Sequence, residues 1–219
     1  MILDLTHDFA FIHITRTAGL SISQAIVAGM KDPTGLLVDL VDGRHATARQ
    51  IRRRVGPKKW DKLYRFAVIR SPWEIIESDW RLTLRETERL GPLAQLDWRP
   101  QWYARVARVA VHRSFDRFVR DEYLVCDGSI YPDGFWREWC LGSRGEEIGV
   151  EPILYDRLAD EWPRICDRVG ITRCELPRLN GTGPRGPITW SDELADEIGV
   201  VCSGDIDRFG FRPPNVTHP

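Results

Sequence analysis

The chain has 219 residues, a formal net charge of −1, 42% hydrophobic residues and 29% charged residues. This composition is typical of a globular protein with a sizeable core, and it excludes a disordered chain. The near-neutral charge excludes a global basic field for nucleic acid, and no stretch approaches the roughly 18 apolar residues of a membrane span. We therefore expect a single soluble domain over residues 1–219 that binds neither nucleic acid nor a membrane.

The cysteines indicate the compartment. They are scattered, odd in number and without a C-x-x-C pair, at Cys126, Cys140, Cys166, Cys174 and Cys202. This pattern favours buried reduced thiols over a zinc site or a disulfide framework. The first residues show no signal-peptide pattern. We expect a cytoplasmic protein, in a compartment that keeps thiols reduced.

Short apolar runs alternate with helical patterns along the chain. Strands are predicted over residues 9–14, 36–41, 64–69 and 153–155. Helices are predicted over 21–30, 48–55, 73–90, 101–111, 114–121, 135–141 and 158–169, with a last helix before the C-terminus. This alternation predicts an α/β fold with a central, mostly parallel sheet flanked by helices.

Several residues predict where the helices begin. Thr47 and Ser114 are expected to cap the helices that follow them, and Thr189 with Asp192 resembles a capping box. Pro163 is expected in the first turn of its helix or at a kink.

The first strand–loop–helix unit spans residues 10–29. An apolar run is followed by a small polar turn over residues 15–19, and a helical stretch opens at Ser21. The free N–H groups and dipole of a helix N-terminus form an anion site, and this loop adds Arg16 and the hydroxyls of Thr17 and Ser21. The Walker A pattern is absent from the chain. An ordinary turn with a Ser cap is the alternative interpretation.

A basic helix follows Thr47. It carries Arg49, Arg52, Arg53 and Arg54, with Lys58 and Lys59 just beyond it. A solvated helix face is the favoured interpretation, and a surface for an anionic acceptor is the alternative.

A second strand–loop–helix unit spans residues 64–80 and carries different chemistry. Arg70 follows the strand, and Ser78 lies about two helical turns further on. Anion-binding groups after two strands fit a ligand with two separated phosphates at the carboxyl edge of an open sheet. A surface ion pair at Arg70 and an ordinary helix-face hydroxyl at Ser78 are the alternatives.

These two units resemble the sulfotransferase family that uses 3′-phosphoadenosine 5′-phosphosulfate (PAPS). Its 5′-phosphosulfate loop P-K-T-[AG]-G-T-[ST] is similar to TRTAGLS at 15–21, and its 3′-phosphate motif is similar to FAVIRSP at 66–72 with Ser78. Weaker matches follow the same order along the chain, at residues 44–47, 114–119, 153–158, 176–180 and 205–211. The resemblance is greatest to the compact carbohydrate and heparan-type and small bacterial members, and it implies a P-loop-like three-layer fold. Arg16 stands in place of the family Lys, Leu20 in place of a Thr and Ser71 in place of an Asn.

The resemblance also implies roles for particular residues. Arg16 and the loop residues Thr17, Ala18, Gly19, Leu20 and Ser21 would hold the 5′-phosphate and the charge that develops on the leaving oxygen. Arg70 and Ser78 would hold the 3′-phosphate, and Arg178, Asn180 and Arg185 would close over a ligand. No metal is implied.

An acceptor hydroxyl needs a general base. His45 is the first candidate because imidazole titrates near neutral pH, and because the family places a His or Glu in this region. A cap or surface role is its alternative. His13, in a buried strand, is expected to be a core residue and is the second choice.

The expected reaction is sulfuryl transfer from PAPS to a small-molecule or glycan hydroxyl, leaving adenosine 3′,5′-bisphosphate. The acceptor itself is not specified by the sequence. Tryptophans in polar surroundings could line its cleft, although core packing is favoured for most of them, at Trp98, Trp102, Trp136 and Trp139. A nucleotide-binding protein that has lost catalysis is the first alternative function. A P-loop-like phosphotransferase is the second alternative. It would need a Lys in a Walker A loop, and this chain has no such loop.

Overall fold

The computed structural model describes residues 1–31, 36–38, 45–90, 100–124, 131, 133–179 and 188–214. The chain divides into two compact units, which are treated separately below. The sheet unit comprises Met1–Arg70 and Gly134–Gly181, and the helical unit comprises Ser71–Asp133 and Thr182–Pro219. The expectation of a single domain stays a prediction.

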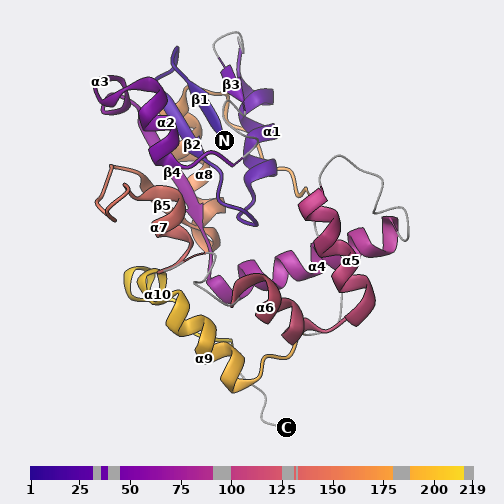
Figure 1. Ribbon diagram of the computed structural model, residues 1–219. Helices are drawn as coiled ribbons and strands as arrows, with labels where there is room; N and C mark the ends of the chain where they lie inside the picture. The colour runs from indigo at the N-terminus through magenta and orange to yellow at the C-terminus, as the bar shows by residue number, and fades with distance from the viewer. Residues whose placement is uncertain are drawn as a thin grey trace. The chain divides into compact units, whose positions relative to one another are not determined.

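The sheet unit is built on a five-stranded sheet in the order β3-β1-β2-β4-β5 (Figure 1). Its strands are β1 (Ile2–Asp4), β2 (Phe9–Ile12), β3 (Leu36–Val38), β4 (Tyr64–Ile69) and β5 (Glu151–Leu154). β2 pairs with β4 and β4 with β5 in parallel, whereas β1 is antiparallel to both β2 and β3. Four of the five strands therefore run in one direction, which confirms the predicted α/β class with a mostly parallel sheet.

One face of the sheet carries the main hydrophobic core. Phe9, Phe11, Phe66 and Val68 alternate along β2 and β4 and are fully buried. They pack against apolar residues of α1 (Gly19–Gly29) and α8 (Leu158–Val169), namely Ile22, Ala25, Ile26, Leu158, Trp162, Ile165 and Val169. Every turn of α8 thus presents an apolar residue to the sheet.

The opposite face of the sheet is also buried. Ala10, Ile12, Ala67 and Ile69 have no exposed surface. α7 (Phe135–Cys140) packs on β4 from this side, and α2 (Ala48–Val55) packs on α7. Burial on both faces explains why the strands are continuous apolar runs rather than alternating ones.

The cap predicted at Thr47 is correct, whereas no Ser caps α1, whose N-cap residue is Ala18. Thr47 forms a full capping box with Gln50 at the start of α2, and α3 (Pro57–Trp60) follows without having been predicted. β1 was also missed, because three residues are too short for a periodic pattern. Pro163 is the sixth residue of α8, so the prediction of a first-turn position is wrong.

The helical unit contains α4 (Pro72–Leu90), α5 (Pro100–His112), α6 (Phe115–Tyr123), α9 (Asp192–Val201) and α10 (Ser203–Phe209). Ser114 caps α6 as predicted, since its hydroxyl accepts the N–H of Arg117. The predicted capping box at Thr189 is wrong, because the cap of α9 is Ser191, which accepts the N–H of Leu194. In the described residues, no helix is long and apolar enough to cross a membrane.

A buried polar network ties three of these helices together. Asp79 on α4 is 7% exposed and accepts hydrogen bonds from Tyr123 Oη on α6 and from Arg105 Nη2 on α5, both at 2.6 Å. Arg105 also pairs with Glu122 at 3.2 Å. Burial, reinforced by the Asp79 carboxylate, raises the pKa of Tyr123 well above its ordinary value, so the phenol stays protonated and donates.

We predict that Asp79→Ala destabilises the protein by about 2–4 kcal/mol, because it removes the acceptor shared by a buried guanidinium and a buried phenol. Urea unfolding measures this difference. The matched control Asp196→Ala removes an exposed carboxylate of α9 and should change the stability by less than about 0.5 kcal/mol. Equal losses for the two variants would contradict a stabilising role for the network.

Candidate functional site

The loop between β2 and α1 has an unusual backbone. Arg16 and Ala18 both adopt positive φ angles, 63° and 64°, although neither is a glycine. Thr17 lies between them without a positive φ. Alternation of this kind turns successive N–H groups toward one side and makes a concave anion-binding nest. Each left-handed non-glycine residue costs about 1–3 kcal/mol, a strain that clusters at functional sites.

The nest leads directly into α1. Ala18 is the N-cap residue and has no side-chain cap, while its carbonyl accepts the N–H of Ile22 at 3.0 Å. The N–H groups of the first helical turn have no acceptor within any α-helix. At α1 they therefore face the same small region as the nest and carry the positive end of the helix dipole.

The two hydroxyls of the loop have partners in the sheet unit. Thr17 is fully buried and donates to the carbonyl of Ile14 at 2.8 Å, which holds the turn closed. Ser21 is 6% exposed, and its Oγ accepts the N–H of Leu179 at 3.4 Å. Thr17 thus shapes the loop through its hydroxyl, and Ser21 links the loop to the segment around Leu179.

His13 fixes the position of Gly19. A Cβ atom at Gly19 would lie 1.8 Å from the His13 ring, so only glycine fits at the first position of α1. His13 is 7% exposed, in agreement with the predicted burial, and its ring stacks on Phe11 with centroids 5.9 Å apart. The imidazole of His13 therefore lies against the start of α1.

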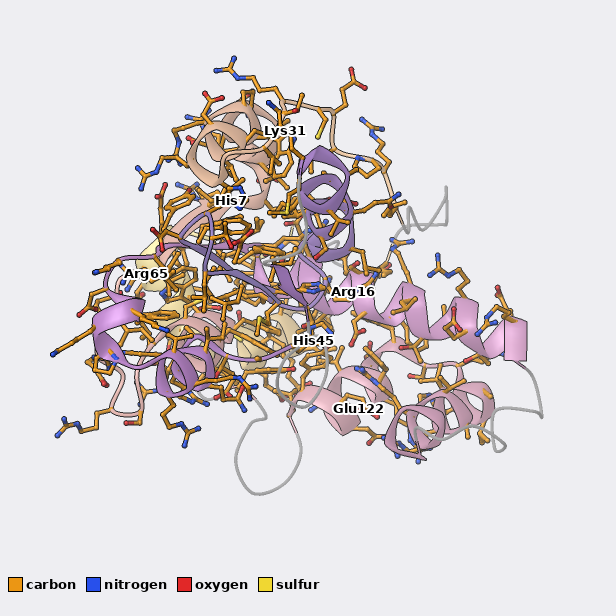
Figure 2. All side chains as sticks on the ribbon, turned by 90° about the horizontal axis from the view of Figure 1, so that it is seen from above. His7, Arg16, Lys31, His45, Arg65 and Glu122 are labelled. Carbon is orange, nitrogen blue, oxygen red and sulfur yellow. The ribbon has the colours of Figure 1, made fainter. Side chains whose placement is uncertain are left out.

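His45 lies beside His13. Its Nδ1 is 3.2 Å from the His13 carbonyl oxygen, and the two ring centroids are 4.7 Å apart. Trp139 of α7 meets the His45 ring edge-on at 5.8 Å. His45 itself is exposed, and Figure 2 labels it together with Arg16 in the view from above. The structure thus places His45, the candidate general base, beside His13, whose ring lies against Gly19 at the end of the loop.

Arg70 occupies the end of the neighbouring parallel strand. It follows β4 directly, and its guanidinium lies over the ring of Tyr155 at 4.5 Å. Tyr155 follows β5 in the same way. Because β2, β4 and β5 are parallel, their carboxyl ends lie at one edge of the sheet, where open α/β sheets bind ligands.

The roles of the remaining predicted residues at this edge stay predictions. Ser78 is half-buried on α4 and belongs to the helical unit, so its pairing with Arg70 stays a prediction. Asn180 and Arg185 lie outside the described residues. Arg178 is described and exposed.

Two aromatic residues contribute contacts that no sequence pattern specified. Tyr155 is predicted as the last residue of the strand 153–155, without a role in the site, whereas the structure places it just after β5, as Arg70 follows β4. Trp139 is among the tryptophans that could line a cleft, with core packing favoured for most of them; it is 8% exposed and contacts His45. The thiol prediction is confirmed for Cys140, Cys166 and Cys202, whereas Cys174 is exposed.

Comparisons with protein-family models, curated proteins and solved structures found no match for this chain. Within the described residues, no cluster of three or more His, Cys, Asp or Glu side chains is arranged to hold a metal ion.

Gly19→Ala should destabilise the protein by about 1–3 kcal/mol, because the new methyl group overpacks against the His13 ring. Gly199→Ala is the matched control in α9, where a Cβ would meet Trp73 at an ordinary 3.7 Å. That change should instead stabilise the protein by up to about 1 kcal/mol through helix propensity. Thermal unfolding of both variants tests the contact, and a neutral or stabilising Gly19→Ala would contradict it.

Proposed function

We propose that this protein is a sulfotransferase that moves the sulfuryl group of PAPS to the hydroxyl of a carbohydrate or small-molecule acceptor. The main supporting observation is the loop of Arg16–Ser21, in which two strained residues form a nest directly before an uncapped helix N-terminus. A nest at a helix start suits a phosphate or phosphosulfate group.

The residues at the sheet edge fit such a nucleotide. Arg16 and the N–H groups from Thr17 to Ser21 would hold the 5′-phosphate end. Arg70 would hold the 3′-phosphate, with Ser78, Asn180 and Arg185 assigned to the nucleotide from the sequence pattern. Arg70 is kept in place by its contact with Tyr155. PAPS would supply an electron-poor sulfuryl group and a leaving group that gathers negative charge.

The chain's own task is positioning and charge stabilisation. The loop N–H groups and Arg16 would stabilise the charge on the leaving oxygen. His45 would take the proton from the acceptor hydroxyl, since it is exposed and lies beside His13 at the loop. The ring of His45 also meets Trp139 edge-on.

A nucleotide-binding protein without catalysis is the second candidate. Arg16 stands where the resembling family has Lys, and Lys and Arg hold phosphate differently. Leu20, in place of a Thr, is 39% exposed and supplies no hydroxyl. Nucleotide binding without sulfuryl transfer to any acceptor would favour this candidate, whereas magnesium-dependent ATP turnover would favour a phosphotransferase.

Adenosine 3′,5′-bisphosphate at a hundredfold excess over its Kd should raise Tm by about 5–10 °C, and Arg70→Ala should abolish the rise. The matched control is Arg168→Ala. Arg168 also lies over a tyrosine ring, that of Tyr64 at 4.3 Å, but this tyrosine begins β4 rather than following it. The control should keep the full rise. A rise that survives in Arg70→Ala would rule out the 3′-phosphate assignment.

Radiolabelled sulfate from PAPS should pass to at least one member of a pool of glycans, phenols and alcohols. With that acceptor, His45→Ala should lower kcat by about 10²–10⁴-fold, as expected for loss of a general base, with little change in nucleotide affinity. Transfer kinetics and calorimetric nucleotide binding separate these effects. Unchanged kcat would remove His45 as the base, and transfer to no acceptor would count against the enzyme.

A further inference from the structure

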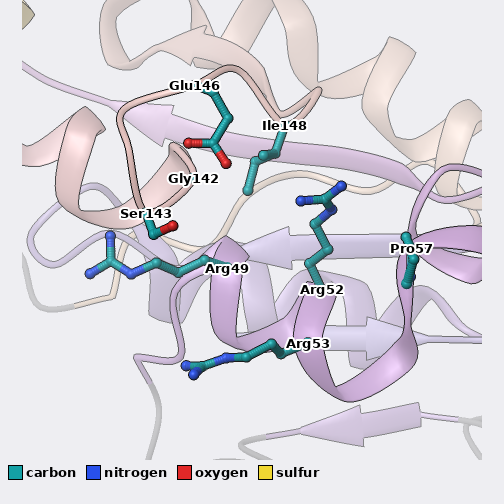
Figure 3. Close-up of a pocket in the computed structure, with 8 residues that line it drawn as sticks. All are labelled: Arg49, Arg52, Arg53, Pro57, Gly142, Ser143, Glu146 and Ile148. Carbon is teal, nitrogen blue, oxygen red and sulfur yellow. The ribbon is translucent and has the colours of Figure 1, made fainter.

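A pocket of about 460 Å³ lies between α2 and the segment that follows α7 (Figure 3). All the residues that line it belong to the sheet unit. Its volume is within the range of pockets for small molecules. The nucleotide assignments above use none of these residues.

One wall of the pocket is cationic. Arg49, Arg52 and Arg53 are three and four residues apart on α2 and so share one face of the helix. The opposite face is anchored in the protein through Ala48 and Ile51, which are fully buried. The capping box at Thr47 fixes the start of the helix, so the three arginines are presented by a rigid element.

Of the three arginines on this wall, one forms an ion pair with a carboxylate of the protein. Arg49 pairs with Glu138 of α7 at 2.6 Å. Among the described residues, Arg52 and Arg53 have no carboxylate within ion-pair distance. The Nε atom of Arg52 is buried and has no acceptor in the described part of the chain. A buried guanidinium N–H without an acceptor is costly.

The opposite wall carries one carboxylate, that of Glu146. Hydrogen bonds from its own N–H and that of Arg144, together with the charge of Arg144 and Arg52, lower the pKa of the Glu146 carboxyl. Glu146 folds over Gly142 and is exposed, so it lies at the rim. Figure 3 shows Arg49 reaching toward Ser143 and Arg52 rising toward Ile148.

The floor adds apolar surface. Ile148 is 8% exposed, and its carbonyl accepts the indole N–H of Trp60 at 2.8 Å, which fixes this end of the segment. Pro57 at the start of α3 lines the pocket beside it. A ligand for this space therefore has a compact, partly apolar body and one charged group.

We infer that this pocket binds the oxoanion group of a compact ligand, such as the phosphate ester, sulfate ester or carboxylate of a sugar, against the face of α2 that carries Arg49, Arg52 and Arg53. Arginine recognises such groups through paired charge-assisted hydrogen bonds. The site is separate from the proposed nucleotide site and does not require that proposal to hold.

Calorimetric titration with glucose 6-phosphate, glucose 6-sulfate and glucuronate tests the inference, with neutral glucose as the reference ligand. At least one charged sugar should bind with a Kd below about 1 mM, and glucose should not. Arg52→Gln should weaken that binding by about tenfold or more, through loss of a charge-assisted contact. Arg53→Gln is a second variant at an exposed position, where folding is not at risk, and it should weaken binding several-fold.

Arg54→Gln is the matched control, because it removes the same charge from the same helix at an exposed position outside the pocket. It should change affinity by less than about twofold, as expected for a screened charge. Equal losses in Arg52→Gln and Arg54→Gln would show a diffuse basic field and overturn the inference. Failure of every charged sugar to bind at about 10 mM would also overturn it, as would displacement of the sugar by adenosine 3′,5′-bisphosphate.

Discussion

The parallel pairing of β2, β4 and β5 is the constraint on which the candidate site depends. Parallel strands bring their carboxyl ends to one edge, and here each of these strands is followed by a chemically useful residue or loop. Burial on both faces fixes the strands, because Phe66 points to α1 and α8 while Ala67 points to the opposite layer. A one-residue slip would reverse both sets of side chains, so the register at this edge is strongly determined.

The loop after β2 combines strain with close packing. Arg16 and Ala18 hold left-handed conformations that cost free energy, and Thr17 compensates in part by donating to Ile14 within the buried turn. His13 then lies where any side chain at Gly19 would have to be. Because Gly19 has no side chain and the backbone of Arg16 and Ala18 is left-handed, the loop exposes backbone N–H groups. Such groups suit an anion of phosphate size.

α7 connects the sheet-edge site with the arginine pocket. Its Trp139 contacts His45, and the preceding residue Glu138 pairs with Arg49 in the pocket. The two features for which we propose anion binding thus lie in the same unit. The loop offers backbone N–H groups at a helix start, whereas the pocket offers guanidinium groups on a helix face. A backbone nest binds a compact phosphate group at short range. Arginine side chains bind a charged substituent that projects from a larger ligand.

The sequence by itself determined the α/β class, the span of β4, the helix 48–55 and the caps at Thr47 and Ser114, because each depends on local periodicity or on hydrogen bonds within one turn. It also located the loop at 15–21 and Arg70, which follows β4. Only the tertiary structure decided that Tyr155 holds Arg70, and that His45 meets His13 across 32 positions of the chain. Only the fold showed that three arginines of a basic helix line a pocket, because a helical pattern shows which residues share a face but not which distant segment covers that face.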